Sequence, residues 1–217
     1  MNFPGTLLPA IQLSARYDAD HLADDLRLLP EAQWREHEFS LSNRASGTYP
    51  EAILWDEPGP VPALALCPAL NLFLRAFPAG VRHARLAHLT PGLHIVSHID
   101  RVGRYHDDAV TVHVPITTNP RAQIVVAGKR YHMSPGELWF LDTYCLHSIA
   151  NRGTTSRIHL ILECEPDDSI NKLLGFDIEA YRRNNLLAHH EQYARFLRRE
   201  QRWKRLAGAS SRDSEKL

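Results

Sequence analysis

The chain has 217 residues, and its 25 Lys and Arg balance its 25 Asp and Glu, so the formal charge at pH 7 is zero. This balance argues against the basic field of a nucleic-acid or membrane-surface binder, and the length suits one domain with a sizeable core. Three cysteines without a CxxC spacing favour a reduced compartment. The N-terminus has no secretory pattern and no segment reaches the apolar length of a membrane span, so we expect a cytoplasmic globular protein.

The first eighty residues predict short strands and two helices. A strand is expected at 8–13, followed by a helix that Asp18 or Asp20 caps and Pro30 ends. Strand pieces, a proline-rich connection and an apolar helix are expected after it, at Phe39 and Leu41, 52–55, 58–68 and 69–77. We expect these helices to cover an outer face of the block that follows.

From Val81 the chain changes to short alternating runs separated by turn residues. Runs with the period of β-strands lie at 82–89, 93–98, 109–116, 122–127, 137–142 and 157–163. Turn residues separate them at Asn119-Pro120, Gly128-Lys129 and Ser134-Pro135-Gly136. Many short strands without intervening helices predict a mainly β fold with flanking helices, built on a double-stranded β-helix, the cupin-like jelly roll.

After Pro166 the pattern becomes helical. Apolar residues recur near helical spacing from Leu186 to Leu206, among many arginines. We therefore predict a jelly-roll domain over 1–168 with its N-terminal covering helices, a helical extension over 169–206 and a disordered tail over 207–217. The apolar stripe favours packing or a homodimer contact for the extension, rather than nucleic-acid binding.

His98, Ile99 and Asp100 carry the first chemical signal. In an extended strand, alternate side chains share a face, so His98 and Asp100 point the same way. A third ligand, His147, is available from a later strand. Two imidazoles and a carboxylate on one side of a metal ion, with the opposite positions open, suit a non-haem Fe(II) centre that activates dioxygen.

Arg157 lies ten residues after His147 and opens an alternating strand. Its guanidinium is suited to bidentate binding of a carboxylate. His113 lies on a strand whose valines face the other way, so it points either into the same cavity or to solvent. Arg85 is a weaker candidate for holding an anionic substrate group, and the pattern favours a surface role for it.

Each of these residues also has a structural interpretation. Single histidines in strands are usually surface or core residues, and a His-x-Asp pair often arises by chance. Trp139 is expected in the core, Asp142 at a turn or cap, and Cys145 as a packing residue. The functional interpretation depends on the combination of His98, Asp100, His147 and Arg157 within one strand-rich block.

Several runs resemble the aspartyl/asparaginyl β-hydroxylase family of Fe(II)- and 2-oxoglutarate-dependent dioxygenases. They are His83-Ala84-Arg85, Ser97-His98-Ile99-Asp100, Val112-His113-Val114, Tyr131-His132-Met133, Gly136-Glu137-Leu138-Trp139-Phe140-Leu141-Asp142, Leu146-His147-Ser148 and Arg157-Ile158-His159-Leu160. Their order and spacing agree from about Val81 to Glu165.

This resemblance implies that His98, Asp100 and His147 are the catalytic iron ligands. It also implies that Arg157, assisted by His113, binds the distal carboxylate of the co-substrate 2-oxoglutarate, with O2 as the oxidant. The carboxylate ligand places the chain with the bacterial members that act on free amino acids. The substrate stays open between an amino acid, an amino-acid derivative and a peptide residue, because Thr111 stands where related strands begin with arginine.

Three rival functions remain. A nucleic-acid demethylase of the AlkB type uses the same ligands, but it carries a second arginine six residues after the first, where this chain has Glu163. A non-catalytic cupin-like module would bind a metal or a small acid without turnover. A zinc hydrolase would need a general base near the metal, and no spare carboxylate is obviously placed for that.

Overall fold

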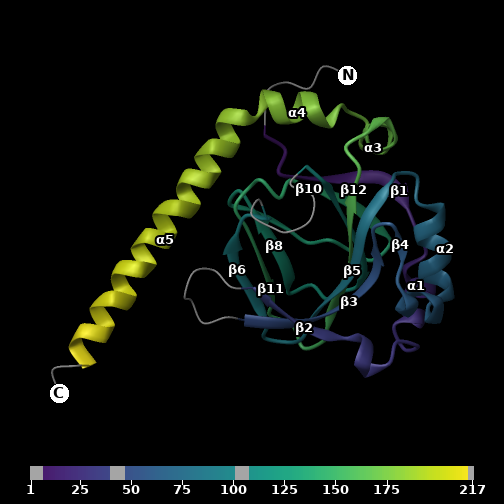
Figure 1. The fold of residues 1–217 in the computed structure, drawn as a ribbon, viewed down its shortest axis with the longest axis horizontal. Coiled ribbons are helices and arrows are strands. Elements are labelled where there is room, and N and C mark those ends of the chain that lie inside the picture. The colour runs from purple at the N-terminus through teal and green to yellow at the C-terminus, as the bar shows by residue number, and fades with distance from the viewer. Residues whose placement is uncertain (1–6, 40–46, 101–107, 215–217) are drawn as a thin grey trace.

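Two antiparallel sheets face each other, and helices cover one outer face (Figure 1). The computed structural model describes residues 7–39, 47–100 and 108–214. The sheets form the mainly β, jelly-roll architecture that the strand pattern predicted. Leu41 lies outside the described residues, so the strand piece expected there has no counterpart to compare.

The larger sheet has eight strands in the order β1-β10-β7-β12-β5-β3-β2, with β4 paired to β3. Their bounds are β1 Ala10–Arg16, β2 Arg35–Phe39, β3 Gly47–Asp56, β4 Gly59–Pro60, β5 Val81–Leu89, β7 Val110–Thr117, β10 Glu137–Leu141 and β12 Arg157–Cys164. Residues directly opposite in antiparallel strands share a face, so the register of this sheet decides which side chains meet at the cavity.

The smaller sheet has four strands in the order β6-β11-β8-β9. Their bounds are β6 His94–His98, β8 Ala122–Val126, β9 Lys129–Tyr131 and β11 His147–Asn151. A two-residue turn joins β8 to β9, and both of its residues, Ala127 and Gly128, have positive φ. This geometry matches the twist of a tight hairpin.

Two short helices close the outer face of the larger sheet. They are α1 Ala19–Asp25 and α2 Pro68–Ala76. Asp18 caps α1 by accepting a hydrogen bond from the backbone N–H of His21 at 3.0 Å, as predicted. Leucines of both helices join a core with the outward valines of β7, so the cavity side of that strand is left to Thr111 and His113.

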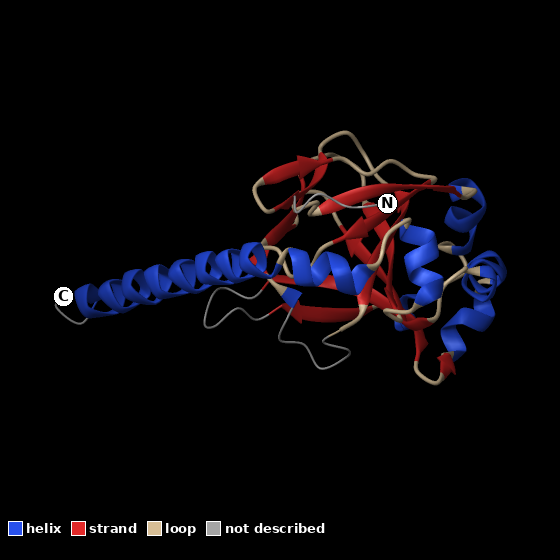
Figure 2. Ribbon diagram, turned by 90° about the horizontal axis from the view of Figure 1, so that it is seen from above, coloured by secondary structure: helices blue, strands red, loops and turns tan. Residues whose placement is uncertain are grey.

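Three helices follow the last strand: α3 Asp168–Leu174, α4 Ile178–Asn184 and α5 Leu186–Ser214. The N-terminal end of α5 packs on the domain, and the rest projects away from it (Figures 1 and 2). The helix continues to Ser214, whereas the composition from Ala207 predicted a disordered tail. None of the helices in the described part of the chain is long and apolar enough to cross a membrane.

Six predicted strands are present within one or two residues of their expected bounds. The strand expected at 8–13 is shifted to Ala10–Arg16. The pattern did not identify β11, because His147-Ser148-Ile149-Ala150-Asn151 has only one large apolar residue. Its strand conformation is stabilised by pairing with β6 and β8 rather than by its own composition.

Candidate metal centre and its cavity

His98, Asp100 and His147 converge at one end of the cavity. His98 ends β6 and His147 begins β11, and the register of the two strands places them opposite each other. Their ring centroids are 4.2 Å apart. Asp100 Oδ1 lies 3.2 Å from His98 Nε2 and 3.5 Å from His147 Nε2. The three donor atoms are therefore close enough to bind one metal ion.

Both imidazoles are oriented by backbone carbonyls. His98 Nδ1 lies 2.7 Å from the carbonyl oxygen of Val96, and His147 Nδ1 lies 2.9 Å from that of Cys145. A carbonyl can only accept, so each Nδ1 carries the proton and donates. Each Nε2 is then left as a ligand atom facing Asp100, which is the arrangement that orients histidine at metal sites.

Burial would lower the pKa of His98, but its hydrogen bond with Asp100 and the charge of Asp100 raise it overall. The pKa values of the other two candidate ligands suit a metal. Burial lowers the pKa of His147 to about 4, and the neighbouring His98 acts in the same direction. Burial alone would raise the pKa of Asp100, but His147, His98 and Arg85 together hold it well below its usual range. Asp100 is thus an ionised carboxylate and His147 a neutral imidazole at neutral pH, as metal ligands must be.

A cavity of about 120 Å³ extends from these residues between the two sheets. Part of its wall is apolar, formed by Leu89, Ile95, Leu141, Ile149 and Ile161. Polar side chains complete it at His37, Tyr49, Arg85, Thr111, His113 and Arg157. The mixture suits a small polar ligand that must be shielded from bulk water.

Arg157 is buried in this wall with an incomplete set of partners. It is 2% exposed, and its NH2 group donates to His159 Nδ1 at 2.8 Å. Among the described residues, NH1 finds no hydrogen-bond partner. Burial without a nearby carboxylate lowers the pKa of Arg157 to about 9, although Tyr49 acts in the opposite direction. A buried cation of this kind is stabilised when an anion enters the cavity.

His113 lines the same wall, so the solvent-facing alternative is wrong for this residue. Its Nδ1 lies 3.3 Å from His159 Nδ1, the atom to which Arg157 also donates. Burial, and then the charge of Arg157, hold the pKa of His113 well below the usual range. His113 is therefore a neutral imidazole beside the guanidinium.

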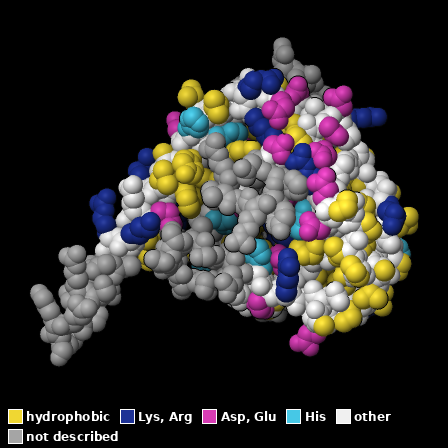
Figure 3. Space-filling model, viewed as in Figure 1, with side chains coloured by type: hydrophobic (Ala, Val, Ile, Leu, Met, Phe, Trp, Pro, Cys, Tyr) yellow, Lys and Arg dark blue, Asp and Glu magenta, His cyan; other side chains and the backbone are white. Residues whose placement is uncertain are grey.

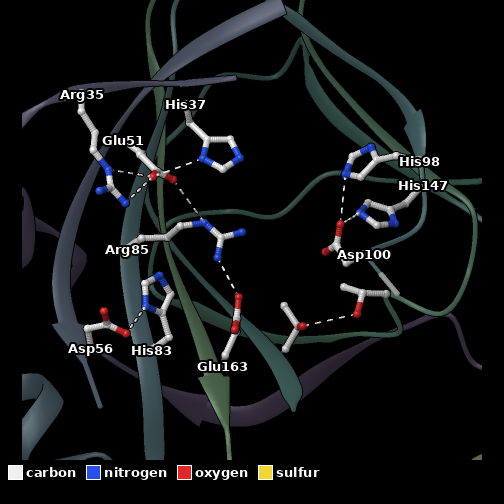
Figure 4. Close-up of polar contacts among 12 residues, drawn as sticks. Arg35, His37, Glu51, Asp56, His83, Arg85, His98, Asp100, His147 and Glu163 are labelled. Atoms are coloured by element: carbon white, nitrogen blue, oxygen red, sulfur yellow. Dashed lines mark hydrogen bonds and ion pairs between the residues drawn. The ribbon is translucent and has the colours of Figure 1, made fainter. Parts of the chain in front are cut away.

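Arg85 also faces the cavity, but its charge is compensated. Its NH1 lies 2.8 Å from Glu163 and its Nε lies 3.7 Å from Glu51. Burial would raise the pKa of Glu51, but His37, Arg85 and Arg35 lower it overall, so Glu51 stays ionised. Figure 4 shows this group on the side of the cavity opposite the metal ligands.

Sequence reasoning missed His37, Tyr49 and Glu51 as part of the site. They lie on β2 and β3, which reach the cavity only because β3 pairs with β5. No local motif marks them, and only the pairing of strands distant in the chain brings them there. Asp142, predicted at a turn, is at that turn but is also buried at the centre of a polar cluster.

The fold and the site together define a class: a jelly roll that carries two histidines and a carboxylate at the mouth of an inter-sheet cavity, as in the non-haem iron oxygenases. The family model of the aspartyl/asparaginyl beta-hydroxylases matches residues 19–166. The chain belongs to this family, which is one of 2-oxoglutarate-dependent oxygenases that use Fe(II).

The chain is 27% identical over 167 residues to the L-proline cis-4-hydroxylase of Rhizobium meliloti. The match covers 69% of this chain and 58% of that protein, so the chain spans less than two thirds of this relative. The family resemblance seen in the motifs is confirmed by this match and by the family model.

The solved structures that are similar in fold include the following two. An oxidoreductase of the 2OG-Fe(II) oxygenase family from Burkholderia pseudomallei superposes with a TM-score of 0.55 at 15% identity, covering 71% of this chain and 84% of that one. The α-ketoglutarate-dependent carbocyclase SnoK from nogalamycin biosynthesis gives 0.53 at 11% identity, covering 73% and 81%. At these identities the likeness concerns the fold alone.

Proposed function

We propose that the protein is an Fe(II)- and 2-oxoglutarate-dependent dioxygenase that hydroxylates an unactivated C–H bond of an amino acid, an amino-acid derivative or a peptide residue. The proposal rests on one observation above all. The cavity that holds the three candidate ligands also holds a buried arginine with an unused donor, NH1 of Arg157. A metal centre beside an uncompensated cation fits a co-substrate that both chelates a metal and carries a distal carboxylate.

His98, Asp100 and His147 would hold the iron. Two neutral imidazoles and one carboxylate are the donor set that suits Fe(II), and they occupy one side of the ion. When bound, iron and 2-oxoglutarate supply the oxidising chemistry that the protein's own side chains lack. The protein's part is to fix the tautomers through Val96 and Cys145 and to keep Asp100 ionised.

Arg157 would bind the distal carboxylate of 2-oxoglutarate. Its NH1 is free to donate, and the hydrogen bond from NH2 to His159 holds the guanidinium plane in place. His113, neutral and on the neighbouring strand, would assist through its ring. The contrast with Arg85 supports the assignment, since Arg85 already has two carboxylates, whereas Arg157 has none among the residues that the structure describes.

The wall around Arg85 would receive the substrate. It faces the candidate metal centre across the cavity and combines one guanidinium with the carboxylates Glu51 and Glu163 (Figure 4). Opposite charges close together suit a ligand that carries both an ammonium and a carboxylate group. The activity of the R. meliloti relative on proline supports a small amino acid as the first compound to test.

One assay tests the proposal. The protein is incubated with Fe(II), 2-oxoglutarate and a panel of amino acids and peptides, and succinate release is measured together with a gain of one oxygen by mass spectrometry. Substrate-dependent succinate with an oxidised product is expected. Metal binding without succinate would instead indicate a non-catalytic binding module.

The demethylase alternative finds no support at the position that distinguishes it. Glu163 stands where that class has its second arginine, and its carboxylate pairs with Arg85.

A further inference from the structure

Asp142 lies at the centre of a second buried cluster, outside the cavity. It sits on the turn between β10 and β11 and is 3% exposed. Its Oδ2 is 2.8 Å from His189 Nε2, 2.8 Å from the hydroxyl of Tyr181 and 3.6 Å from the thiol of Cys145. Its Oδ1 accepts from the backbone N–H of Tyr144 at 3.2 Å. Both carboxylate oxygens therefore have donors.

Asp142, Cys145 and His189 also lie close enough together to be considered as metal ligands. The distances favour hydrogen bonds instead. Ligand atoms around one ion at about 2.0–2.3 Å stand more than 3 Å apart in a tetrahedral site, whereas His189 Nε2 and Asp142 Oδ2 are 2.8 Å apart. The three donors also converge on the same oxygen, so a cation would have to displace bonds already made.

The turn that Asp142 holds touches two of the three candidate iron ligands. The carbonyl of Thr143 accepts from the backbone N–H of Asp100 at 3.4 Å. The carbonyl of Cys145 accepts from His147 Nδ1 at 2.9 Å and so selects the tautomer of that imidazole. A shift of residues 142–145 would therefore move Asp100 and rotate His147 together.

Two of the groups that donate to Asp142 come from the C-terminal helices, beyond the part of the chain that matches the family model, residues 19–166. Tyr181 is on α4 and His189 is on the first turns of α5. The His189 ring stacks on Tyr144 at 5.4 Å between centroids, and the guanidinium of Arg182 lies over the same Tyr144 ring at 5.2 Å. The two helices thus contact this short turn at both Asp142 and Tyr144.

We infer that Tyr181 and His189 are positioning residues for the metal centre, acting through Asp142, so that the C-terminal helices set the metal affinity of the jelly roll. The inference rests on the proposed function only in that His98, Asp100 and His147 bind a metal. It does not require turnover of any particular substrate.

The test is a titration of the purified, metal-free full chain with Co(II) alone, followed by visible absorption and by melting temperature. Asp100→Ala, which removes a ligand, establishes the signal of the metal centre. His189→Ala is expected to weaken Co(II) binding by about 10- to 100-fold and to change the absorption spectrum. His190→Ala is the matched control, because His190 is the exposed neighbour on the same helix, and it should bind as the unaltered protein does.

Two conservative variants separate positioning from folding. His189→Gln keeps an N–H donor near Asp142 and should restore most of the affinity, and Tyr181→Phe, which removes only the hydroxyl, should show a smaller loss. A lower melting temperature with unchanged Co(II) affinity and spectrum would overturn the inference. So would a second equivalent of Co(II) that disappears in His189→Ala, since the cluster would then be a metal site. Failure of the unaltered protein to release succinate, with these results intact, would count against the proposed function alone.

Discussion

At the scale of single residues, the two arginines that line the cavity, Arg85 and Arg157, differ in what surrounds them. Arg85 is paired with Glu51 and Glu163, whereas within the described ranges Arg157 has only the neutral His159 as a side-chain partner. Their sequence contexts look alike, since each is an arginine in an alternating strand. What separates the candidate co-substrate site from the candidate substrate wall is whether carboxylates neutralise the charge of the arginine, rather than the residue type.

Asp100→Ala should abolish succinate release and weaken metal binding. The change removes the one carboxylate of the candidate ligand set and leaves two imidazoles. Asp24→Ala is a suitable control, because Asp24 forms only an exposed pair with Arg27 and should change stability by less than about 0.5 kcal/mol. If the Asp100→Ala protein turned over at the rate of the unaltered protein, Asp100 would not be a ligand of the catalytic metal.

Arg157→Ala should raise the KM for 2-oxoglutarate while leaving metal affinity unchanged. Truncating one partner of a buried charge pair costs about 2–5 kcal/mol, which corresponds to at least about 30-fold in affinity. Steady-state assays over a range of 2-oxoglutarate concentrations measure the effect, and Co(II) titration is the control. An unchanged KM would assign the distal carboxylate to another residue.

The affinity for 2-oxoglutarate should also fall at high pH. The charged form of Arg157 is the one that binds a carboxylate, and burial lowers its pKa to about 9 in the empty cavity. Binding should therefore be constant near neutral pH and weaken as the pH rises through about 9. Titration with Mn(II) in place of iron between pH 7.5 and 10 measures this, and a flat profile across that range would contradict it.

The spacing of His98 and Asp100 singled them out as candidate ligands, and the structure brings them and His147 together. The physical reason differs from the one expected, because β6 ends at His98 and Asp100 lies beyond the strand, so strand alternation does not place it. The role of Asp142 was not predictable, because its partners lie 39 and 47 residues further along the chain. From the neighbouring residues in the sequence alone, an aspartate at an exposed turn cannot be distinguished from one, like Asp142, that is buried and accepts several hydrogen bonds.

At the scale of elements, the alternation of apolar and polar residues predicted those strands that have one apolar and one polar face. On β7 the valines pack outward with the helices, and Thr111 and His113 face the cavity. The polar strand β11 was not identified as a strand, and β2 was expected only at Phe39, since the pairing partners decide the conformation of both. Turn residues located the breaks well, because Gly and Pro act on the backbone directly.

Gly136, in the predicted turn before β10, shows this backbone effect. It has a φ of +82°, and an added Cβ would lie 3.3 Å from the carbonyl oxygen of Tyr17. Gly136→Ala should therefore destabilise the protein by about 1–2 kcal/mol, measured by urea denaturation. Gly59→Ala, where nothing lies within 4 Å of an added Cβ, is the matched control and should change little.

At the scale of the whole molecule, the domain and its C-terminal helix differ in surface character. Basic side chains lie along the described part of α5 (Figure 3), where Leu187 is 80% and Trp203 50% exposed. A homodimer contact through this helix stays a prediction. Under our inference, the metal centre depends on the first turns of α5, which contact the turn at Asp142.

Metal and co-substrate together should raise the melting temperature of the whole domain. A ligand that binds only the folded state at about 100 times its Kd adds about 2.7 kcal/mol, which corresponds to about 5–10 °C for a protein of this size. Differential scanning with Mn(II) and 2-oxoglutarate measures the shift, and a chelator should reverse it. The same additions to the Asp100→Ala protein should give a smaller shift.

The cavity lies between two layers that carry different groups. The candidate iron ligands His98 and His147 come from the smaller sheet, whereas Arg157, His113 and Arg85 come from the larger one. Under the proposed function, the iron-binding histidines and the residues around the substrate therefore lie on different sheets. Exchanging side chains on β2, β3 and β5 would change which substrates are accepted while the histidines on the opposite sheet stay in place, which makes that wall the natural place to engineer a new selectivity.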